Sequence, residues 1–512
     1  MISTSPKVVH PIVKNIEHSI RLAKRLRCLN MFITETFETA LARAEKLAEV
    51  APSDKALFGS PVAIKDCYST EGVKTTCASR MLSNYVPPYT ATVVQKLMDE
   101  GTIMLGKTNM DEFSMGASST DSIYSPVKNP WTLKLMAEDR QNEDPPHKQL
   151  AHDWYLAGGS SGGSAVSVAC GISRIALGSD TGGSTRNPAA FCGIVGLKPT
   201  YGVLSRHGLI PLVNSLDVPG ILARNVDDAA LALDVLAGRD VYDSTSVDRC
   251  EASYALDDLP DIRSVTVGLP REYHISDLSP EILKWWGAIA GLLERAAGCQ
   301  LKEVSMPHTE LSIICYHVLG ECEIASNMAR YDGIEFGHRV DEQSNFNKLL
   351  AVSRSEAFNE VVRRRILAGN YFLLRSNYEE YFLKALKIRR LIANDFYNVF
   401  RGRGGQSKVD ILLTPVTFGE PPLYSEWKAG EGQGYERERK DDFFTQPVNM
   451  AGVAAVTIPV ALSKRGLPIG LQLIADRFQE KKLLSVAKWI EKTVLFPSLD
   501  GHKLCWWSSD DA

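Results

Sequence analysis

A run of glycine and serine, GGSSG at residues 158–162, is the first segment whose residue types could do chemistry. It fits G-x-S-x-G, the turn that exposes a nucleophilic serine in α/β hydrolases, with Ser160 as the nucleophile. Such an enzyme also needs an acid and then a histidine downstream, and several histidines qualify equally. The preceding WYLA at 154–157 is a weak strand signal. Taken alone, the run fits an ordinary tight turn as well as a catalytic one.

A second glycine-rich turn, DTGGS at residues 180–184, ends in another serine, Ser184. A serine hydroxyl needs a base at neutral pH. A lysine can be that base only if desolvation lowers its pKa enough to leave it neutral. Lys65, which follows the apolar residues 62–64, is such a candidate. The alternative is an ordinary lysine whose charged head reaches solvent past an apolar stem.

The elements that must position these residues alternate between strand and helix. Residues 61–64 predict a buried strand that ends at Lys65, residues 92–100 a helix that Gly101 stops, and residues 102–105 a second strand. This alternation of strand, helix and strand is typical of a parallel sheet and predicts the α/β class. Asn225 is the expected N-cap of a later helix, which closes a compact unit near residue 240.

Beyond that unit, strand and helix signals resume at 265–268 and 282–297, so we expect the same sheet to continue. We therefore predict one domain over residues 31–512, with a catalytic core at about 56–240. Residues 137–153 and 426–440 are charged or glycine-rich without periodicity, which predicts surface insertions.

Composition excludes several classes of protein. The 512 residues are 44% hydrophobic and 23% charged, with a net charge of −4, so the chain lacks the basic field of a stand-alone nucleic-acid binder. No apolar stretch reaches the roughly 18 residues that a membrane span needs. Ten cysteines form no C-x-x-C pair, and no H-E-x-x-H is present, so we expect neither a disulfide framework nor a bound metal.

The N-terminal segment, residues 1–30, carries six Lys or Arg against the single acid Glu17, with apolar residues at helical spacing. This pattern is typical of an organellar targeting segment, and it fits a surface helix of the mature fold or a partner-contact region equally well.

The glycine-serine motifs resemble the signature of the amidase signature family. The resemblance rests on GSSGGSA at 159–165, GSDTGGS at 178–184 and NPA at 187–189, and it extends from about residue 56 to about residue 475. It implies the amidase signature fold, a large mixed, mainly parallel central sheet covered by helices on both faces.

The resemblance also implies a Ser-cisSer-Lys triad. In it Ser184 is the acyl-forming nucleophile, Ser160 the bridging serine and Lys65 the final base. A hydroxyl between nucleophile and amine can donate to one while accepting from the other, so the proton moves along a short chain. The N–H groups of Thr181, Gly182 and Gly183, with that of Ser184, would form the oxyanion hole.

Five further segments resemble one branch of that family, the glutaminase subunits of tRNA-dependent amidotransferases. They are KTNMDEF at 107–113, GLKPTYG at 196–202, RYDG at 330–333, RRI at 364–366 and PVNMAG at 447–452. The resemblance implies that glutamine is hydrolysed and its ammonia converts Glu-tRNA(Gln) to Gln-tRNA(Gln). It implies B and C subunits as partners, ATP and Mg used by the partner with no cofactor in this chain, and a mitochondrial matrix location, or otherwise the cytoplasm.

In that branch a tyrosine, an arginine and an aspartate hold free glutamine, and they align with Tyr316, Arg365 and Asp442. A guanidinium fits the α-carboxylate and a carboxylate fits the α-ammonium. Arg365 follows two other arginines, so a solvated basic face is the alternative, and Tyr316 could instead be a core tyrosine. Two other functions stay open: a free-standing amidase for another small amide, and a non-catalytic scaffold with the same fold.

Overall fold

Our computed structural model describes residues 10–50, 54–138, 150, 153–248, 251, 253–341, 345–429 and 442–504. The strands are β1 (Phe32–Glu35), β2 (Pro61–Lys65), β3 (Ile103–Thr108), β4 (Ile175–Asp180), β5 (Val195–Lys198), β6 (Val218–Ala223), β7 (Thr266–Pro270), β8 (Gln300–Val304), β9 (Ile411–Pro415), β10 (Ala454–Leu462) and β11 (Pro468–Ala475). They form one sheet of 11 strands in the order β1-β3-β2-β4-β6-β5-β10-β11-β9-β7-β8.

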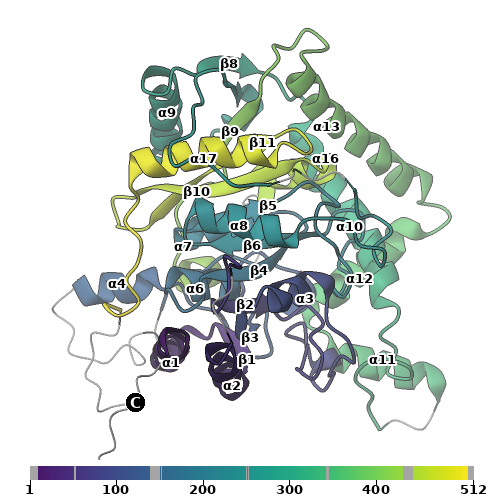
Figure 1. The fold of residues 1–512 in the computed structure, drawn as a ribbon. Coiled ribbons are helices and arrows are strands. Elements are labelled where there is room, and N and C mark those ends of the chain that lie inside the picture. Colours follow the sequence, from purple (N-terminus) through teal and green to yellow (C-terminus); the bar gives the residue numbers. More distant parts are fainter. Residues whose placement is uncertain are drawn as a thin grey trace, which may run out of the picture.

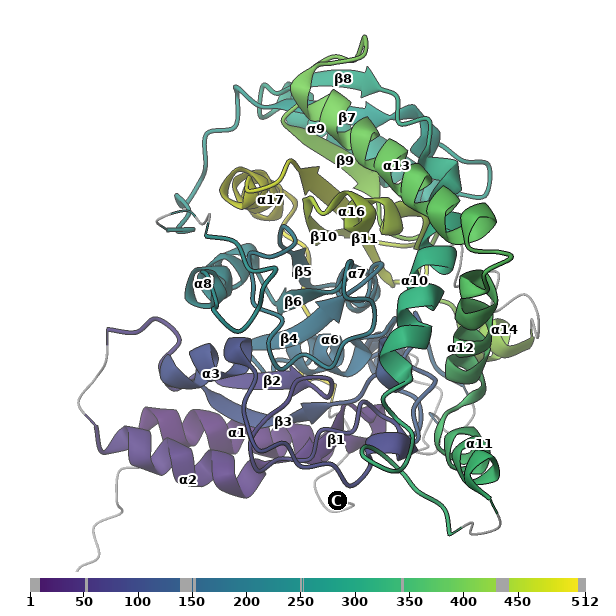
Figure 2. The same cartoon turned by 90° about the vertical axis from the view of Figure 1, so that its right-hand side faces the viewer.

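Helices cover both faces of this sheet. They are α1 (Pro11–Arg25), α2 (Phe37–Ala48), α3 (Thr92–Asp99), α4 (Trp131–Glu138), α6 (Gly162–Ala169), α7 (Arg186–Cys192), α8 (Val226–Leu236), α9 (Pro280–Arg295), α10 (Ser312–Met328), α11 (Phe346–Ala357), α12 (Glu360–Leu373), α13 (Lys384–Arg401), α14 (Tyr424–Ala429), α16 (Gln446–Ala451) and α17 (Glu480–Val494). A π-helix, η6 (Glu379–Leu383), joins α12 to α13, and a short 3₁₀ helix, η7 (Asp442–Phe444), precedes α16. Figure 2 shows α3, α8 and α17 on one face of the sheet and α6 and α7 on the other.

The sheet is mixed. Parallel pairing joins β2 to β3 and β4, and β7 to β8 and β9, whereas the other six of the ten neighbouring pairs are antiparallel. The predicted α/β class and large mixed sheet are confirmed, but the expectation that parallel pairs predominate is wrong. Only residues 463–467 connect β10 to β11, and so short a connection can join only antiparallel strands, because a parallel pair needs a crossover of about a dozen residues.

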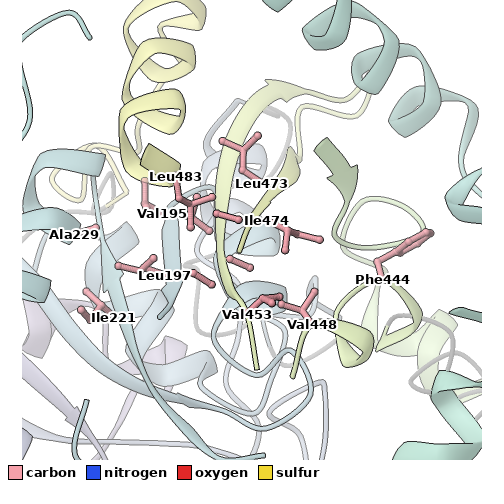
Figure 3. Close-up of a cluster of buried hydrophobic side chains, with 14 of the residues drawn as sticks. Val195, Leu197, Ile221, Ala229, Phe444, Val448, Val453, Leu473, Ile474 and Leu483 are labelled. Carbon is pink, nitrogen blue, oxygen red and sulfur yellow. The ribbon is translucent and has the colours of Figure 1, made fainter. Parts of the chain in front are cut away.

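Successive residues of each strand point to opposite faces of the sheet, so the buried apolar residues form two cores. Ile175 and Leu177 of β4 belong to the larger core, which includes the inner faces of α8 and α17, and Ala176 between them belongs to the second. Figure 3 shows part of the larger core, where Val195 and Leu197 of β5 lie near Leu483 of α17. The sheet is therefore buried on both faces, as expected of an α/β protein.

The N-terminal helix α1 is part of this structure. Its residues Val13, Ile16 and Ile20 are buried in the second core, where α1 packs on α2 (Figure 1). The basic segment 1–30 thus has its apolar stripe inside the fold from residue 11 onward, while residues 1–9 lie outside the described part, and its targeting role stays a prediction. Most of the predicted insertions at 137–153 and 426–440 also lie outside the described residues.

The cysteines of the described ranges lie mostly inside the fold. Of these eight residues, seven are buried and Cys28 is partly exposed. No helix among the described residues is long and apolar enough to cross a membrane.

Candidate active site

Two adjacent parallel strands bring the predicted lysine and serines to one edge of the sheet. β2 pairs with β4 in register, with Ile64 opposite Leu177. Lys65 is the last residue of β2, and β4 ends at Asp180, after which the second glycine-rich turn begins. Because carboxyl ends of parallel strands lie at the same edge, this turn starts beside Lys65.

Lys65 is enclosed by serine hydroxyls. Its side chain is 0% exposed, and Nζ lies 2.7 Å from Ser160 Oγ and 2.9 Å from the Oγ atoms of Ser161 and Ser179. Burial lowers the pKa of the Lys65 amine, although Cys67, Asp111 and Asp180 oppose the shift. Hydroxyls can both donate and accept, so a neutral amine can keep all three contacts. A lysine head reaching solvent is therefore excluded.

The loop before α6 presents Ser160 to this amine. The Gly159–Ser160 peptide bond is cis, as the family resemblance implies for the bridging serine. A Cβ on Gly159 would lie 2.3 Å from Asp111 Oδ2 and 2.6 Å from the Ser118 amide nitrogen, so only glycine fits. Asp111 itself is fixed because it accepts a 2.9 Å hydrogen bond from the Ser119 N–H.

Ser184 lies next to this buried pair and is more accessible. The Ser161 N–H donates to the Ser184 carbonyl oxygen at 3.2 Å, which joins the two glycine-rich turns. Ser184 is partly exposed, whereas Lys65 and Ser160 are fully buried. Of the three predicted triad residues, Ser184 is therefore the one that solvent reaches, while the lysine is shielded from water.

The turn between β4 and Ser184 is held from two sides. Thr181 Oγ1 donates to Asp217 Oδ1 at 2.7 Å, and Thr445 Oγ1 donates to the Gly182 carbonyl at 2.5 Å. Gly183 has φ of 144°, and a Cβ there would lie 2.4 Å from Thr445 Oγ1, so glycine is required. Burial raises the pKa of Asp217 to about 6, although hydrogen bonds from Thr181 and from backbone N–H groups favour the ionised form.

A buried ion pair between Arg186 and Asp180 also holds the turn in place. Arg186 donates to Asp180 through Nε at 3.0 Å and Nη2 at 2.8 Å, and neither side chain is exposed. The same guanidinium donates to Asn449 Oδ1 at 2.5 Å and to Gln472 Oε1 at 2.6 Å. Burial would raise the pKa of Asp180, but Arg186 reverses this and lowers it to about 2. The pair thus ties the turn to α16 and β11.

Removing one partner of this pair should destabilise the protein strongly. We expect Arg186→Met to lower the free energy of unfolding by about 3 to 5 kcal/mol, because Asp180 is then left buried without its counter-ion. Urea unfolding of purified variants measures this. The matched control is Arg263→Met, which breaks the pair with Asp261 whose side chains are 79% and 62% exposed, and which we expect to leave the free energy of unfolding nearly unchanged. Equal losses in both variants would contradict this role for Arg186.

Two of the three predicted glutamine ligands lie at the same turn, and the charge of the third lies near one of them. A Cβ on Gly182 would lie 3.1 Å from Tyr316 Oη, and one on Gly183 would lie 3.3 Å from Asp442 Oδ1. Burial raises the pKa of Tyr316, the nearby Arg365 guanidinium lowers it and Asp442 raises it, so these charges lie around one phenol. Arg365 is half-buried while its two arginine neighbours are exposed, which distinguishes it from a solvated basic face.

Sequence reasoning missed several residues that complete the site. Ser161 and Ser179 share the Lys65 amine with Ser160, and Asp217 holds Thr181. Ser179 could have been found, because it comes near the end of a strand whose parallel neighbour ends at Lys65. Asp217 carries no such signal. Within the described ranges, no three His, Cys, Asp or Glu side chains gather as metal ligands would.

Comparisons with known proteins show to which family the chain is similar. The Amidase family profile matches residues 15–137 and 150–484. The A subunit of the mitochondrial glutamyl-tRNA(Gln) amidotransferase of Xenopus tropicalis is 54% identical over 483 residues, which are 94% of this chain and 91% of the relative. The human protein of the same description is 51% identical over 489 residues, covering 95% of this chain and 91% of the relative.

Solved structures show the same fold. The crystal structure of the A subunit of glutamyl-tRNA(Gln) amidotransferase from Thermotoga maritima superposes with a TM-score of 0.75 at 33% identity, covering 96% of this chain and 94% of that chain. A 6-aminohexanoate cyclic dimer hydrolase superposes with a TM-score of 0.78 at 23% identity over 96% of each chain, which shows the shared fold alone. With a buried lysine among serines, a glycine-rich turn and a family match over most of its length, the chain belongs to the amidase family.

Proposed function

We propose that this chain is the glutaminase subunit of a tRNA-dependent amidotransferase, which hydrolyses glutamine and supplies ammonia to make Gln-tRNA(Gln) from Glu-tRNA(Gln). The observation that carries the proposal is that Tyr316 and Asp442 lie at the turn that holds Ser184, with the partly buried Arg365 guanidinium near Tyr316. A general amidase needs no cation and anion at that place, whereas a free amino acid substrate needs both. The relatives named above support the same assignment.

The first chemical step uses the serines and the lysine. The Ser184 hydroxyl attacks the side-chain amide carbon of glutamine and passes its proton to Ser160, whose own proton moves to the Lys65 amine. The 2.7 Å contact between Lys65 Nζ and Ser160 Oγ provides the second half of this path. The same chain of groups then returns a proton to the leaving nitrogen. The C–N bond breaks, ammonia leaves, and a glutamyl ester remains on Ser184.

The glycine-rich turn stabilises the charge that develops. In the tetrahedral intermediate the former carbonyl oxygen carries a negative charge and accepts hydrogen bonds from the N–H groups of Thr181, Gly182 and Gly183. Each such donor is worth about 3 kcal/mol of barrier when it is held in place beforehand. Asp217 and Thr445 hold this turn. Water then attacks the ester by the reverse proton path and releases glutamate.

Substrate selection rests on the charged residues. We propose that Arg365 binds the α-carboxylate of glutamine and that Asp442 binds its α-ammonium group. Tyr316 contacts the part of the substrate that lies between these two groups. We expect Arg365→Ala to lower kcat/KM for glutamine roughly 30-fold or more, mainly through KM, because a charged hydrogen-bond pair is lost. Steady-state kinetics of ammonia release measures this. The matched control is the exposed neighbour Arg364→Ala, and an equal effect there would contradict the assignment.

The proposed assembly supplies the chemistry this chain does not perform. Relatives that are A subunits of amidotransferases imply partner subunits. We propose that these are B and C subunits, that the partner uses ATP and Mg to activate Glu-tRNA(Gln), and that the complex works in the mitochondrial matrix. The net charge of −4 fits this division, because the glutaminase subunit need not bind tRNA itself.

Substrate comparison tests the proposal. The purified chain, alone and with B and C subunits, is assayed for ammonia release from glutamine and for hydrolysis of aryl and fatty-acid amides. We expect glutamine to be hydrolysed and the other amides to be poor substrates. Hydrolysis of aryl or fatty-acid amides with none of glutamine would identify a free-standing amidase. No hydrolysis of any amide, with normal assembly, would identify a scaffold.

A further inference from the structure

The outer side of α12, η6 and the start of α13 exposes large apolar residues. Six of them have exposed fractions of 37% to 71%, and we call this set the apolar face: Leu367, Tyr371, Leu374, Tyr378, Tyr381 and Leu386. Figures 1 and 2 show the junction of α12 with α13 at the margin of the molecule, away from the sheet. Contiguous exposed apolar surface marks an interaction site more often than it marks bare surface.

Several of these residues are neighbours. Leu367 and Tyr371 are four residues apart on one side of α12, and Leu374 follows the last residue of that helix. The Tyr371 and Tyr381 rings lie 5.9 Å apart, which joins α12 to η6. Tyr378 stacks on Phe382 at 5.2 Å, so the aromatic rings are held by their neighbours. Ordered tyrosines give a large contact area at little cost in conformational entropy.

The charges around the apolar face indicate which kind of partner would bind there. Among residues 360–390, six Lys or Arg and three Glu are exposed, in a chain whose net charge is −4. Arg365 and Arg389 are partly buried, and Arg389 donates to the Ser215 carbonyl. The exposed charges around the apolar face are therefore mainly basic, on an acidic protein. A second copy of this chain docking the same face would bring like charges together, which disfavours self-association. An acidic surface on a partner would be complementary in charge to the apolar face and its basic surroundings.

A protein fits this face better than an anionic lipid surface does. Glu379 and Glu380 lie within the face, next to Tyr378 and Tyr381, and Glu380 pairs with Lys384 at 2.7 Å. Anionic headgroups would repel these carboxylates, whereas a folded partner can place a cation opposite them. Tyrosine and arginine together at an ordered surface are also typical of the centre of a protein interface.

We propose that the apolar face docks another subunit of the amidotransferase, whose contact surface is apolar at its centre and acidic at its rim. This inference rests on the proposed function, since only a member of such an assembly needs this partner. The same helix α12 carries Arg365, so the partner contacts the helix that supplies the proposed carboxylate ligand.

The test measures assembly separately from hydrolysis. Recombinant B and C subunits are titrated onto the wild-type chain and onto the double variant Leu367→Glu, Leu374→Glu, whose wild-type side chains are 71% and 52% exposed. We expect Kd to rise roughly 30-fold or more, because carboxylates are placed at the centre of an interface with an acidic partner. Glutamine hydrolysis by the isolated variant should equal that of wild type. The matched control is Val241→Glu, Leu495→Glu, at positions 84% and 76% exposed, which should assemble normally.

Several outcomes would overturn the proposal. They are wild-type affinity in the Leu367, Leu374 variant, no binding of B and C by the wild-type chain, and unchanged assembly with lost binding to phosphatidylserine vesicles, which would identify a lipid surface. Assembly that depends on the apolar face while no glutamine is hydrolysed would instead contradict the proposed function and leave the docking surface standing.

Discussion

Replacing Ser184 with alanine should abolish glutamine hydrolysis, with a loss in kcat of about 10⁶-fold if the serine is the nucleophile. The variant should keep the fold and bind glutamine, because Ser184 is partly exposed and makes its contact with Ser161 through its backbone carbonyl. Ammonia release under saturating glutamine measures the rate, and calorimetric titration measures binding.

The control for this variant is Ser355→Ala, which changes an exposed serine of α11 and should leave the rate unchanged. Ser160→Ala should also slow the reaction strongly, since it breaks the path from Ser184 to Lys65. A Ser184→Ala enzyme that keeps more than a few per cent of wild-type activity would contradict the assignment of the nucleophile.

Replacing Lys65 should remove the general base. We expect Lys65→Ala to lower the acylation rate by roughly 10²- to 10⁴-fold. Lys65→Arg should not restore the rate, because a guanidinium stays protonated. Addition of a small primary amine to Lys65→Ala should restore part of the rate, a result that a purely structural lysine would not give.

The same lysine sets the pH dependence. Burial lowers the pKa of the Lys65 amine, so the base is neutral above that lowered pKa and is lost as pH falls through it. The rate of the wild-type enzyme should therefore fall on the acid side, and pre-steady-state kinetics across pH measures the limb. An active Lys65→Arg enzyme with a flat acid limb would show that another residue is the base.

The sequence predicts the alternation of strands and helices and the spacing of the catalytic candidates, because these depend on local patterns. The strand before Lys65 and the N-cap at Asn225 are both confirmed. The contact of Lys65 with Ser179 depends on two strands pairing across more than 100 residues of chain, which no local pattern contains.

The pairing direction of the strands is the fold feature that sequence reasoning got wrong. The alternation of strand, helix and strand at residues 61–105 correctly predicts that β2 and β3 are parallel. Parallel pairing does not extend to the whole sheet, because β10 and β11 are antiparallel. The role of Asp217 could not be predicted either, because it depends on tertiary packing that brings Asp217 against Thr181 of the turn. Among the three arginines at 363–365, the resemblance alone selects Arg365, and no local pattern predicts that it is more buried than its two neighbours.

Trapping the acyl-enzyme tests the central claim most directly. The chain is incubated with an electrophilic glutamine analogue, digested, and mapped by mass spectrometry, with excess glutamine as competitor. We predict one adduct, on Ser184, that glutamine prevents and that Arg365→Ala diminishes. An adduct on Ser160, or labelling of Ser184 that glutamine does not prevent, would contradict the account.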